Sequence, residues 1–490
     1  MCSESEESKF IFHLRHGRTG VYMNLTLEDV LHASKGKALN ITRASLRNVL
    51  QGVSIDSRKI QPGDLFFALK GERFDAHDFL DRVFATPNVA AVVGRSWAGG
   101  QKRVPNWPLV VVDDTLQALQ EVGAFYRRKF NIPVLAITGS NGKTTTKEMT
   151  ASVLAQKFRV VKTPGNLNNH IGLPLTLFEI TSETEFAVVE MGANHFGEIA
   201  RLCEIADPDF GLITNIGSAH LEYFGSVENV ARAKSELPDY LSAKKGVLFV
   251  NQDDPLAREI GEKVKNRFTY GLAMPSDARG EFVSLDERGC VRFRLNGEDI
   301  HLNVPGAYQV QNALAASAVG LYFGLKINRI KQALESFSGV AKRMEIVKVN
   351  DILILNDTYN ANLDSMKGGL KTLAHIRHRR GGRSFAVLAD MLELGDESER
   401  QHRLVGEIAA EIGINFILTY GKQARFISDA AIEKGLSASY HFEKKEDLEK
   451  FLQSYLRGGD LVLVKGSRGM GMETVVQFLR DRYKNHSPNK

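Results

Sequence analysis

Cysteine is scarce in this chain of 490 residues, which contains only Cys2, Cys203 and Cys290. An odd and widely spaced set forms neither a disulfide framework nor a cluster of metal-binding thiolates, and it favours a protein of the reducing cytoplasm. Long apolar runs are also missing, because no segment approaches the roughly 18–20 apolar residues that a membrane-spanning helix needs. We therefore expect a cytoplasmic protein without membrane insertion.

Net charge is also small, at +5 at pH 7. The basic run at residues 375–383 is too isolated to predict nucleic-acid binding, and a solvated helix end or loop explains it. The first 22 residues lack the apolar core of a signal peptide and precede a second methionine, Met23. We interpret residues 1–22 as a disordered extension.

The sequence does contain an ordinary globular composition, with 43% hydrophobic and 25% charged residues. Its length predicts about three domains, which we place at residues 23–107, 108–341 and 342–490. In the last two, apolar β-branched runs alternate with helical stretches, which indicates parallel sheets buried on both faces. The predicted fold class is α/β, with a small N-terminal domain, a central parallel-sheet domain and a C-terminal Rossmann-like domain.

The string AITGSNGKTTTKEM at residues 136–149 joins an apolar run to a helix-compatible segment. Its glycines allow backbone N–H groups to converge on an anion at the N-terminus of the following helix. Lys143 would neutralise phosphate charge, and the Thr144 hydroxyl would contact a magnesium ion. The general motif has a glycine where Ile137 stands, and a glycine-rich turn with a solvated lysine is the alternative. The strand before the loop and the helix after it favour a nucleotide-phosphate site.

Three further polar side chains follow this loop in the sequence. Glu190 ends an apolar run at residues 186–189, His220 follows the strand predicted at residues 210–216, and Lys234 lies in a predicted helix. Each has a structural alternative, as a solvated carboxylate, a hydrogen-bonded histidine or a snorkelling lysine. Together, behind a phosphate loop, they favour a magnesium site.

Helical periodicity gives Lys234 an inward-facing position. It shares one face of its helix with Val227, Val230 and Ala231, at the spacing of a 3.6-residue repeat, and Ser226 can cap the helix. A buried, unpaired ammonium is costly, so the amine must be paired, neutralised or modified. A carbamate formed with carbon dioxide would convert it into an anionic oxygen ligand for magnesium.

Longer strings resemble the bacterial Mur ligase family, namely ITGSNGKTTTKEM, TPGNLNNHIGLPLTL, VVEMGANHFGEI, TNIGSAHLEYFGS and ARAKSEL. The string DSRKIQPGDLFFALKGERFDAHDF is similar to the uridine-nucleotide domain of that family. NDTYNANLDSM, LADMLELG and LVKGSRGMGMETVV resemble the third domain of its D-alanyl-D-alanine-adding branch. The resemblance covers residues 23–479 and departs at Tyr308, Leu363 and Ala389, where the family commonly has other residues.

The resemblance implies roles for individual residues. The implied catalytic residues are Lys143, Glu190, His220, Lys234 and Arg343. The implied metal ligands are Thr144, Glu190, His220 and a carbamylated Lys234, holding two Mg²⁺ ions. The implied ATP-binding residues are Gly139, Ser140, Asn141, Gly142, Lys143, Thr144, Thr145, Asn312, Arg343 and Asp357. The implied substrate-binding residues are Asp56, Ser57, Arg58, Asp75 and His77 for the uridine diphosphate end, with Asn168, Asn169, Tyr359, Asn360, Asn362, Lys465, Ser467 and Arg468.

The activity implied by the resemblance is ATP-dependent ligation of D-alanyl-D-alanine to UDP-N-acetylmuramoyl-tripeptide, by a monomer, through an acyl phosphate. It is the last cytoplasmic step in assembling the peptide of the peptidoglycan precursor. Two alternatives stay open, namely another amino-acid ligase of the same scaffold, such as a folylpolyglutamate synthase, and a non-catalytic nucleotide-binding regulator. The uridine-type first region argues against the former, and the retention of Glu190, His220 and Lys234 argues against the latter.

Overall fold

The computed structural model describes residues 23–484 with the exception of Arg103 and Ala219, so the extension predicted at residues 1–22 lies outside the described residues. The chain divides into two compact units. Of the described residues, the first unit contains 23–138, 157–211 and 239–247, and the second contains 139–156, 212–238 and 248–484.

The first unit begins with a five-stranded sheet of order β1-β5-β4-β3-β2. All its neighbouring strands are parallel except β1 and β5. The elements here are α1 (Leu27–Ser34), β1 (Lys37–Leu39), β2 (Gly52–Ser54), β3 (Asp64–Phe67), α2 (Leu80–Phe84), β4 (Ala90–Gly94), α3 (Arg95–Gly100), β5 (Leu109–Val112) and α4 (Thr115–Arg128).

The same unit contains a second group of parallel strands, in which β8 pairs with both β6 and β7. Every residue of β8 is buried, as the apolar run at residues 186–189 predicts. The elements are β6 (Val134–Thr138), β7 (Val160–Lys162), α6 (Gly172–Leu177), β8 (Phe186–Glu190) and α7 (Glu198–Ala206). The division between the units cuts through β9 (Phe210–Ile213), α10 (Glu236–Lys244) and β10 (Val247–Asn251).

The second unit contains the helix that follows the phosphate loop and a group of antiparallel strands. β12 pairs in parallel with β11, but β12, β13 and β14 are antiparallel to one another, an arrangement that the sequence analysis did not predict. The elements are α5 (Lys143–Leu154), α8 (Leu221–Phe224), α9 (Val227–Lys234), α11 (Pro255–Gly261), β11 (Asn266–Gly271), β12 (Ala278–Leu285), β13 (Cys290–Leu295), β14 (Glu298–Pro305), α12 (Gln309–Tyr322) and α13 (Ile327–Ser336).

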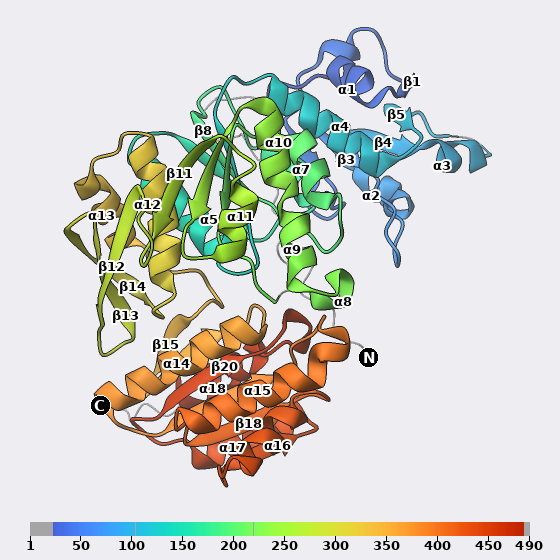
Figure 1. Ribbon diagram of the computed structural model, residues 1–490. Coiled ribbons are helices and arrows are strands. Elements are labelled where there is room, and N and C mark those ends of the chain that lie inside the picture. The colour runs from blue at the N-terminus through green and yellow to red at the C-terminus, as the bar shows by residue number, and fades with distance from the viewer. Residues whose placement is uncertain (1–22, 103, 219, 485–490) are drawn as a thin grey trace, which may run out of the picture. The chain divides into compact units, whose positions relative to one another are not determined.

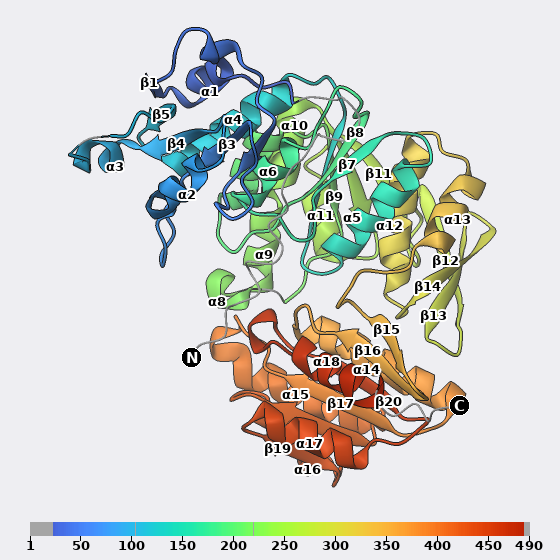
Figure 2. The same ribbon diagram turned by 180° about the vertical axis from the view of Figure 1, so that it is seen from behind.

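The C-terminal part of the second unit is a six-stranded sheet of order β15-β16-β20-β17-β18-β19, parallel apart from β15. The helices α14, α15 and α16 pack on one face, and α17 and α18 pack on the other (Figure 1 and Figure 2). Leu353 and Leu355 of β16 face the first layer, whereas Ile352 and Ile354 face the second. This alternation confirms the predicted doubly wound sheet.

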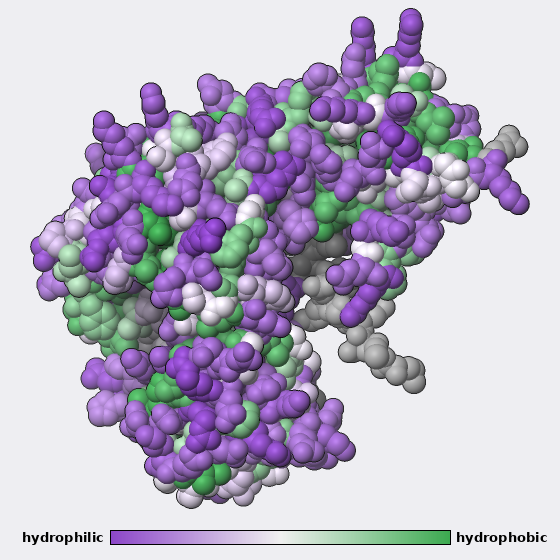
Figure 3. Space-filling view, turned by 45° about the vertical axis from the view of Figure 1, so that its right-hand side comes forward, coloured by the Kyte–Doolittle hydropathy of each residue, from purple (hydrophilic) through white to green (hydrophobic). Residues whose placement is uncertain are grey.

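The elements of this sheet and its helices are β15 (Glu345–Val349), β16 (Ile352–Asp357), α14 (Leu363–Arg380), β17 (Ser384–Ala389), α15 (Ser398–Glu411), β18 (Phe416–Tyr420), α16 (Arg425–Glu433), β19 (Ser439–Phe442), α17 (Lys445–Tyr455), β20 (Leu461–Lys465) and α18 (Glu473–Lys484). Hydrophilic residues predominate on the face shown in Figure 3. Within the described part of the chain, no helix is long and apolar enough to cross a membrane.

Candidate active site

The loop at residues 139–142 has the backbone geometry that the predicted phosphate loop requires. Gly139 and Gly142 have positive φ angles of 142° and 78°, a region that L side chains disfavour. A Cβ atom on Gly142 would lie 2.3 Å from Asn312 Oδ1, and one on Gly139 would lie 2.0 Å from Thr214 Oγ1. Glycine is therefore required at both positions by backbone angle and by space.

Lys143 is the first residue of α5, and its side chain folds over the loop. Its Nζ donates to the main-chain oxygen of Gly139 at 2.7 Å and to that of Ser140 at 3.3 Å. Thr144 and Thr145 follow in the same turn and are buried. The ammonium and the Thr144 hydroxyl thus stand at the positive end of a helix, where an anion is favoured.

The segment after β9 holds the phosphate loop from the other side. The main-chain oxygen of Asn215 accepts from the Ser140 N–H, and its Oδ1 accepts from the Asn141 N–H, both at 2.9 Å. Ser140 Oγ also donates to the Gly217 carbonyl at 3.1 Å. Asn215 and Gly217 were not predicted as loop-forming residues, although the polar string TNIGS directly after a strand was the available signal.

Asn312 lies against the first turn of α5. Its Oδ1 accepts from the Thr146 hydroxyl at 3.1 Å, and its Nδ2 donates to Gln309 Oε1 at 2.8 Å. Together with its closeness to Gly142, these contacts place Asn312 beside the phosphate loop.

Arg343 reaches the phosphate loop from a strained turn. Its Nη2 donates to Thr144 Oγ1 at 2.9 Å, and its guanidinium lies 3.9 Å from the centre of the Tyr359 ring. The residues on either side, Lys342 and Met344, have positive φ angles of 61° and 52°, which are uncommon for residues other than glycine. Such strain persists only where surrounding contacts fix the backbone.

A buried ion pair fixes this turn. Lys465 Nζ lies 2.5 Å from Asp357 Oδ2, and Asp357 Oδ1 accepts from the Met344 N–H at 3.1 Å. Lys465 also donates to the Asn360 carbonyl at 2.9 Å. The sequence resemblance implies separate contacts of Asp357 with nucleotide and of Lys465 with substrate. The structure joins them in one ion pair, whose carboxylate also holds Met344, the residue after Arg343.

The remaining residues predicted in the C-terminal region lie around the same corner. Asn362 caps α14 and donates from Nδ2 to Asn141 Oδ1 of the phosphate loop at 2.8 Å. The Arg468 guanidinium lies 5.9 Å from the centre of the Tyr359 ring. Ser467 is buried, and its Oγ accepts from the Leu392 N–H at 2.9 Å.

His220 and Lys234 differ in their surroundings. His220 is half-buried, and its Nδ1 lies 2.5 Å from Glu393 Oε2; this hydrogen bond lowers the pKa of Glu393. Lys234 is 2% exposed at the end of α9, which confirms the predicted inward position, and Ser226 caps that helix as predicted. Among the residues that the structure describes, no three His, Cys, Asp or Glu side chains form a group able to hold a metal.

In the first unit, Glu190 is buried at the end of β8. Its Oε1 accepts from Asn168 Nδ2 at 2.7 Å, and its N–H donates to Thr163 Oγ1 at 2.9 Å. Asn169 Oδ1 accepts from the Gly172 N–H at 2.8 Å, at the start of α6. Asn168 therefore orients the carboxylate that the sequence predicts as a metal ligand.

The residues predicted to hold the uridine diphosphate end form two short-range pairs. Asp56 receives two hydrogen bonds from the Arg58 guanidinium, both at 2.9 Å, next to Ser57. Burial acts to raise the pKa of Asp56, but these bonds outweigh it and lower the pKa. His77 Nδ1 lies 2.5 Å from Asp75 Oδ1, and its Nε2 accepts from the Gly94 N–H at 2.9 Å. Both ring nitrogens of His77 are therefore engaged within the protein.

A buried histidine supports the loop that carries Glu393. His402 Nε2 accepts from the Met391 N–H at 2.9 Å, and its Nδ1 lies 2.7 Å from the Ser398 carbonyl, which accepts its proton. Burial lowers the pKa of His402, although the hydrogen bond to the Ser398 carbonyl and the charge of Asp390 oppose the shift. The neutral ring is thus the form that fits this site.

Acidification should loosen this loop. The unfolded chain takes up a proton near the ordinary histidine pKa of about 6.5, whereas the native ring resists it, so stability falls as the pH drops below that value. Hydrogen exchange should show the protection factor of the Met391 amide falling between about pH 7.5 and pH 5.5, on either side of that pKa. His402→Gln, which cannot titrate, should show a smaller change, and equal changes in both proteins would contradict the assignment.

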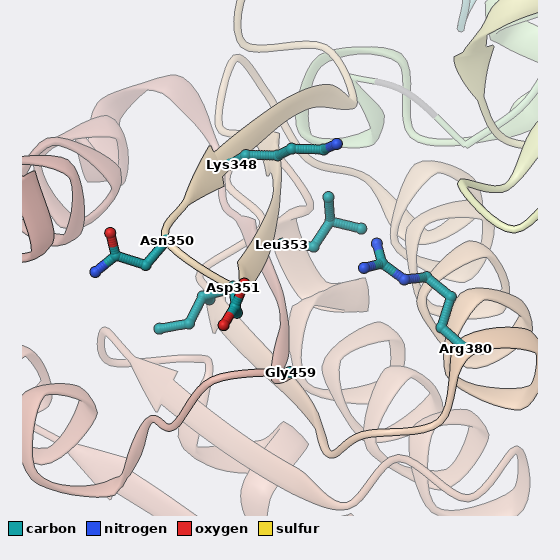
Figure 4. Close-up of a pocket in the computed structure, with 7 residues that line it drawn as sticks. Lys348, Asn350, Asp351, Leu353, Arg380 and Gly459 are labelled. Atoms are coloured by element: carbon teal, nitrogen blue, oxygen red, sulfur yellow. The ribbon is translucent and has the colours of Figure 1, made fainter. Parts of the chain in front are cut away.

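A separate cavity of about 390 Å³ lies at the other end of the six-stranded sheet (Figure 4). It is lined by Lys348, Asn350, Asp351, Ile352, Leu353, Arg380 and Gly459. These residues lie at the end of β15, at the start of β16, just before β20 or at the end of α14, whereas Asp357 and Lys465 lie at the carboxyl ends of β16 and β20. Ligands of α/β sheets bind at the carboxyl ends, and no predicted site residue lines this cavity.

The chain has parallel α/β sheets and a glycine-rich loop, and lysine, threonine and arginine side chains lie at the N-terminus of the helix that follows the loop. These features define the class of nucleotide-phosphate-binding α/β enzymes. Three family domains match the chain: the Mur ligase family catalytic domain at residues 49–127, the Mur ligase middle domain at residues 137–320, and the Mur ligase glutamate ligase domain at residues 342–468. The chain belongs to the Mur ligase family.

Relatives with curated names are similar over nearly their whole length. The UDP-N-acetylmuramoyl-tripeptide–D-alanyl-D-alanine ligase of Bacillus subtilis is 38% identical, over 93% of this chain and 98% of its own. The enzyme of the same name from Escherichia coli is 37% identical, over 90% of this chain and 99% of its own.

Solved structures agree with these sequence relationships. A crystal structure of MurF from Acinetobacter baumannii superimposes with a TM-score of 0.82 at 33% identity, covering 93% of this chain and 98% of that one. MurF ligase from Thermotoga maritima in complex with ADP gives a TM-score of 0.76 at 27% identity, covering 89% and 98%. The fold is therefore the three-domain α/β Mur ligase fold.

Proposed function

We propose that this enzyme uses ATP to join D-alanyl-D-alanine to UDP-N-acetylmuramoyl-tripeptide, releasing ADP and phosphate. The observation that carries the proposal is that two cations lie at the N-terminus of α5, Lys143 over the phosphate loop and Arg343 on Thr144. The curated relatives of the chain have this activity in their names. Those names do not favour a folylpolyglutamate synthase.

The chemistry requires two anions to meet. The terminal carboxylate of the tripeptide attacks the γ-phosphorus of ATP, so that a C–O–P bond forms and ADP leaves. The amine of D-alanyl-D-alanine then attacks the acyl carbon, loses a proton and expels phosphate. Lys143 and Arg343 lower the barrier by neutralising charge on the transferred phosphoryl group.

We further propose that two magnesium ions are held through Thr144, Glu190, His220 and a carbamate on Lys234. Magnesium prefers oxygen ligands such as hydroxyls and carboxylates. Because Lys234 is buried, a carbamate would also remove the positive charge of its ammonium from the interior. When bound, the ions supply further charge neutralisation. The carbamate would form when the neutral amine adds to carbon dioxide, making an N–C bond and releasing one proton.

Replacing Lys234 with alanine should reduce the rate of ADP formation by about 10–100-fold, the usual range for residues that support a metal site. Formate or acetate should restore part of the rate by placing a carboxylate where the carbamate stood. Lys234→Arg, which cannot form a carbamate and fills the space, should not respond. A ¹³C NMR spectrum of active enzyme in labelled bicarbonate that lacks a Lys234-dependent carbamate signal would contradict the modification.

The substrate contacts are proposals that follow the resemblance. Asp56, Ser57, Arg58, Asp75 and His77 are assigned to the uridine diphosphate end in the domain at residues 23–107. Asn168, Asn169, Tyr359, Asn360, Asn362, Lys465, Ser467 and Arg468 are assigned to the remainder of the two substrates. We also propose that the central and C-terminal domains span residues 108–341 and 342–490. The proposed enzyme is a monomer in the cytoplasm.

The decisive test is ADP formation against a panel of nucleotide donors and amine acceptors, with the product identified by mass. We expect ADP only when UDP-N-acetylmuramoyl-tripeptide and D-alanyl-D-alanine are both present. Turnover with a folate and glutamate would support the other ligase. Nucleotide binding without any turnover would support a regulator.

A further inference from the structure

Glu393 and His220 meet through side chain and backbone. Besides the 2.5 Å contact between Glu393 Oε2 and His220 Nδ1, the Glu393 carbonyl accepts from the Glu222 N–H at 3.0 Å. His220 and Glu393 both have positive φ angles, of 55° and 62°. Positive φ angles are unfavourable for residues other than glycine and persist only where surrounding contacts hold them. The contact between His220 and Glu393 is such a contact.

The contact selects one nitrogen of the His220 ring. A carboxylate that accepts a proton at Nδ1 leaves the lone pair at Nε2. Within the described part of the chain, Nε2 takes part in no hydrogen bond, whereas Nδ1 is bound to Glu393. This is the arrangement in which a histidine ligates a metal, with its other ring N–H donated to a carboxylate.

Glu393 is itself held by the C-terminal region. The preceding residue, Leu392, donates its N–H to Ser467 Oγ, and Met391 donates its N–H to His402 Nε2, both at 2.9 Å. The loop at residues 391–393 is thus held by α15 and by the segment that follows β20, while the Glu393 carboxylate holds the His220 ring, which follows β9. The C-terminal region and the segment after β9 therefore meet at the Glu393 carboxylate, which orients His220.

We propose that Glu393 is a positioning residue that holds the His220 ring with Nε2 available to a divalent cation. The inference rests on the proposed function, in which His220 is a magnesium ligand. It follows that docking of the 391–393 loop and binding of the cation–nucleotide complex strengthen each other, because each favours the same ring orientation.

Mn²⁺ binding tests the proposal without relying on turnover. The affinity of the enzyme for Mn²⁺ would be measured by electron paramagnetic resonance in the presence of a non-hydrolysable ATP analogue. Glu393→Ala should weaken it about 10–100-fold, as loss of a carboxylate behind a histidine ligand does. Glu393→Gln should weaken it less, because its amide oxygen can still accept the Nδ1 proton. Glu399→Gln, at an exposed acidic residue of α15, should leave the affinity unchanged.

The variants separate this proposal from the proposed function. If His220→Ala weakens Mn²⁺ binding and both Glu393 variants match the wild type, the positioning role is wrong and the metal assignment stands. If His220→Ala also matches the wild type, His220 is not a metal ligand and the positioning role of Glu393 is wrong. The ligase activity of the proposed function is tested separately, by ADP formation. If Glu393→Ala does not fold, Glu393→Gln decides alone: weakened binding supports the proposal, and unchanged binding overturns it.

Discussion

Replacing Lys143 with alanine should lower kcat for ligation by about 10²–10³-fold, the range for loss of one preorganised electrostatic contact to a transition state. The side chain is the cation at the N-terminus of α5, next to the Thr144–Arg343 contact. Without it, the attacking carboxylate meets a triphosphate whose charge is less well neutralised. ADP release with both substrates present measures the effect.

Binding of the uridine nucleotide should stay nearly unchanged in the same variant, because its predicted residues belong to a different domain of the chain. Titration calorimetry with UDP-N-acetylmuramoyl-tripeptide measures this second quantity. Lys326→Ala, at an exposed lysine before α13, is the matched control and should ligate normally. An equal loss of ligation and uridine-nucleotide binding in Lys143→Ala would contradict the domain assignment.

Local signals were sufficient for much of the fold. The apolar run at residues 134–138 followed by glycine and lysine predicted β6, the phosphate loop and α5, because strand pattern, turn chemistry and helix start agree over a few residues. The inward position of Lys234 was also predicted from a local signal, because four residues on one face of a helix are enough to indicate which side chains point inward.

Non-local pairing was not predictable in the same way. The antiparallel strands β12, β13 and β14 were missed, although an Asn296-Gly297 turn, typical of a hairpin, joins the last two. The contacts of Glu393 with His220 and of Lys465 with Asp357 join residues 173 and 108 positions apart, and no local pattern in one sequence encodes such partners.

The second large effect should follow from Lys465→Met. Lys465 is 1% exposed and Asp357 is 8% exposed, so the substitution leaves a buried carboxylate without its cation. Breaking a buried pair in this way costs about 3–5 kcal/mol. Because Asp357 also fixes the turn that presents Arg343, kcat should fall together with stability. Hydrogen exchange of amides in β16 and β20 gives the unfolding free energy of this sheet.

The double variant Lys465→Met/Asp357→Asn decides whether the uncompensated charge is the cause. Asparagine keeps the oxygen that accepts the Met344 N–H and removes the negative charge, so the double variant should be more stable than Lys465→Met alone. The turn that carries Arg343 should also be more ordered than in Lys465→Met alone, so part of the lost kcat should return. If the double variant were as unstable as Lys465→Met, lost packing of the lysine stem would explain the effect. If Lys465→Met matched the wild type, the ion pair would contribute nothing to either property.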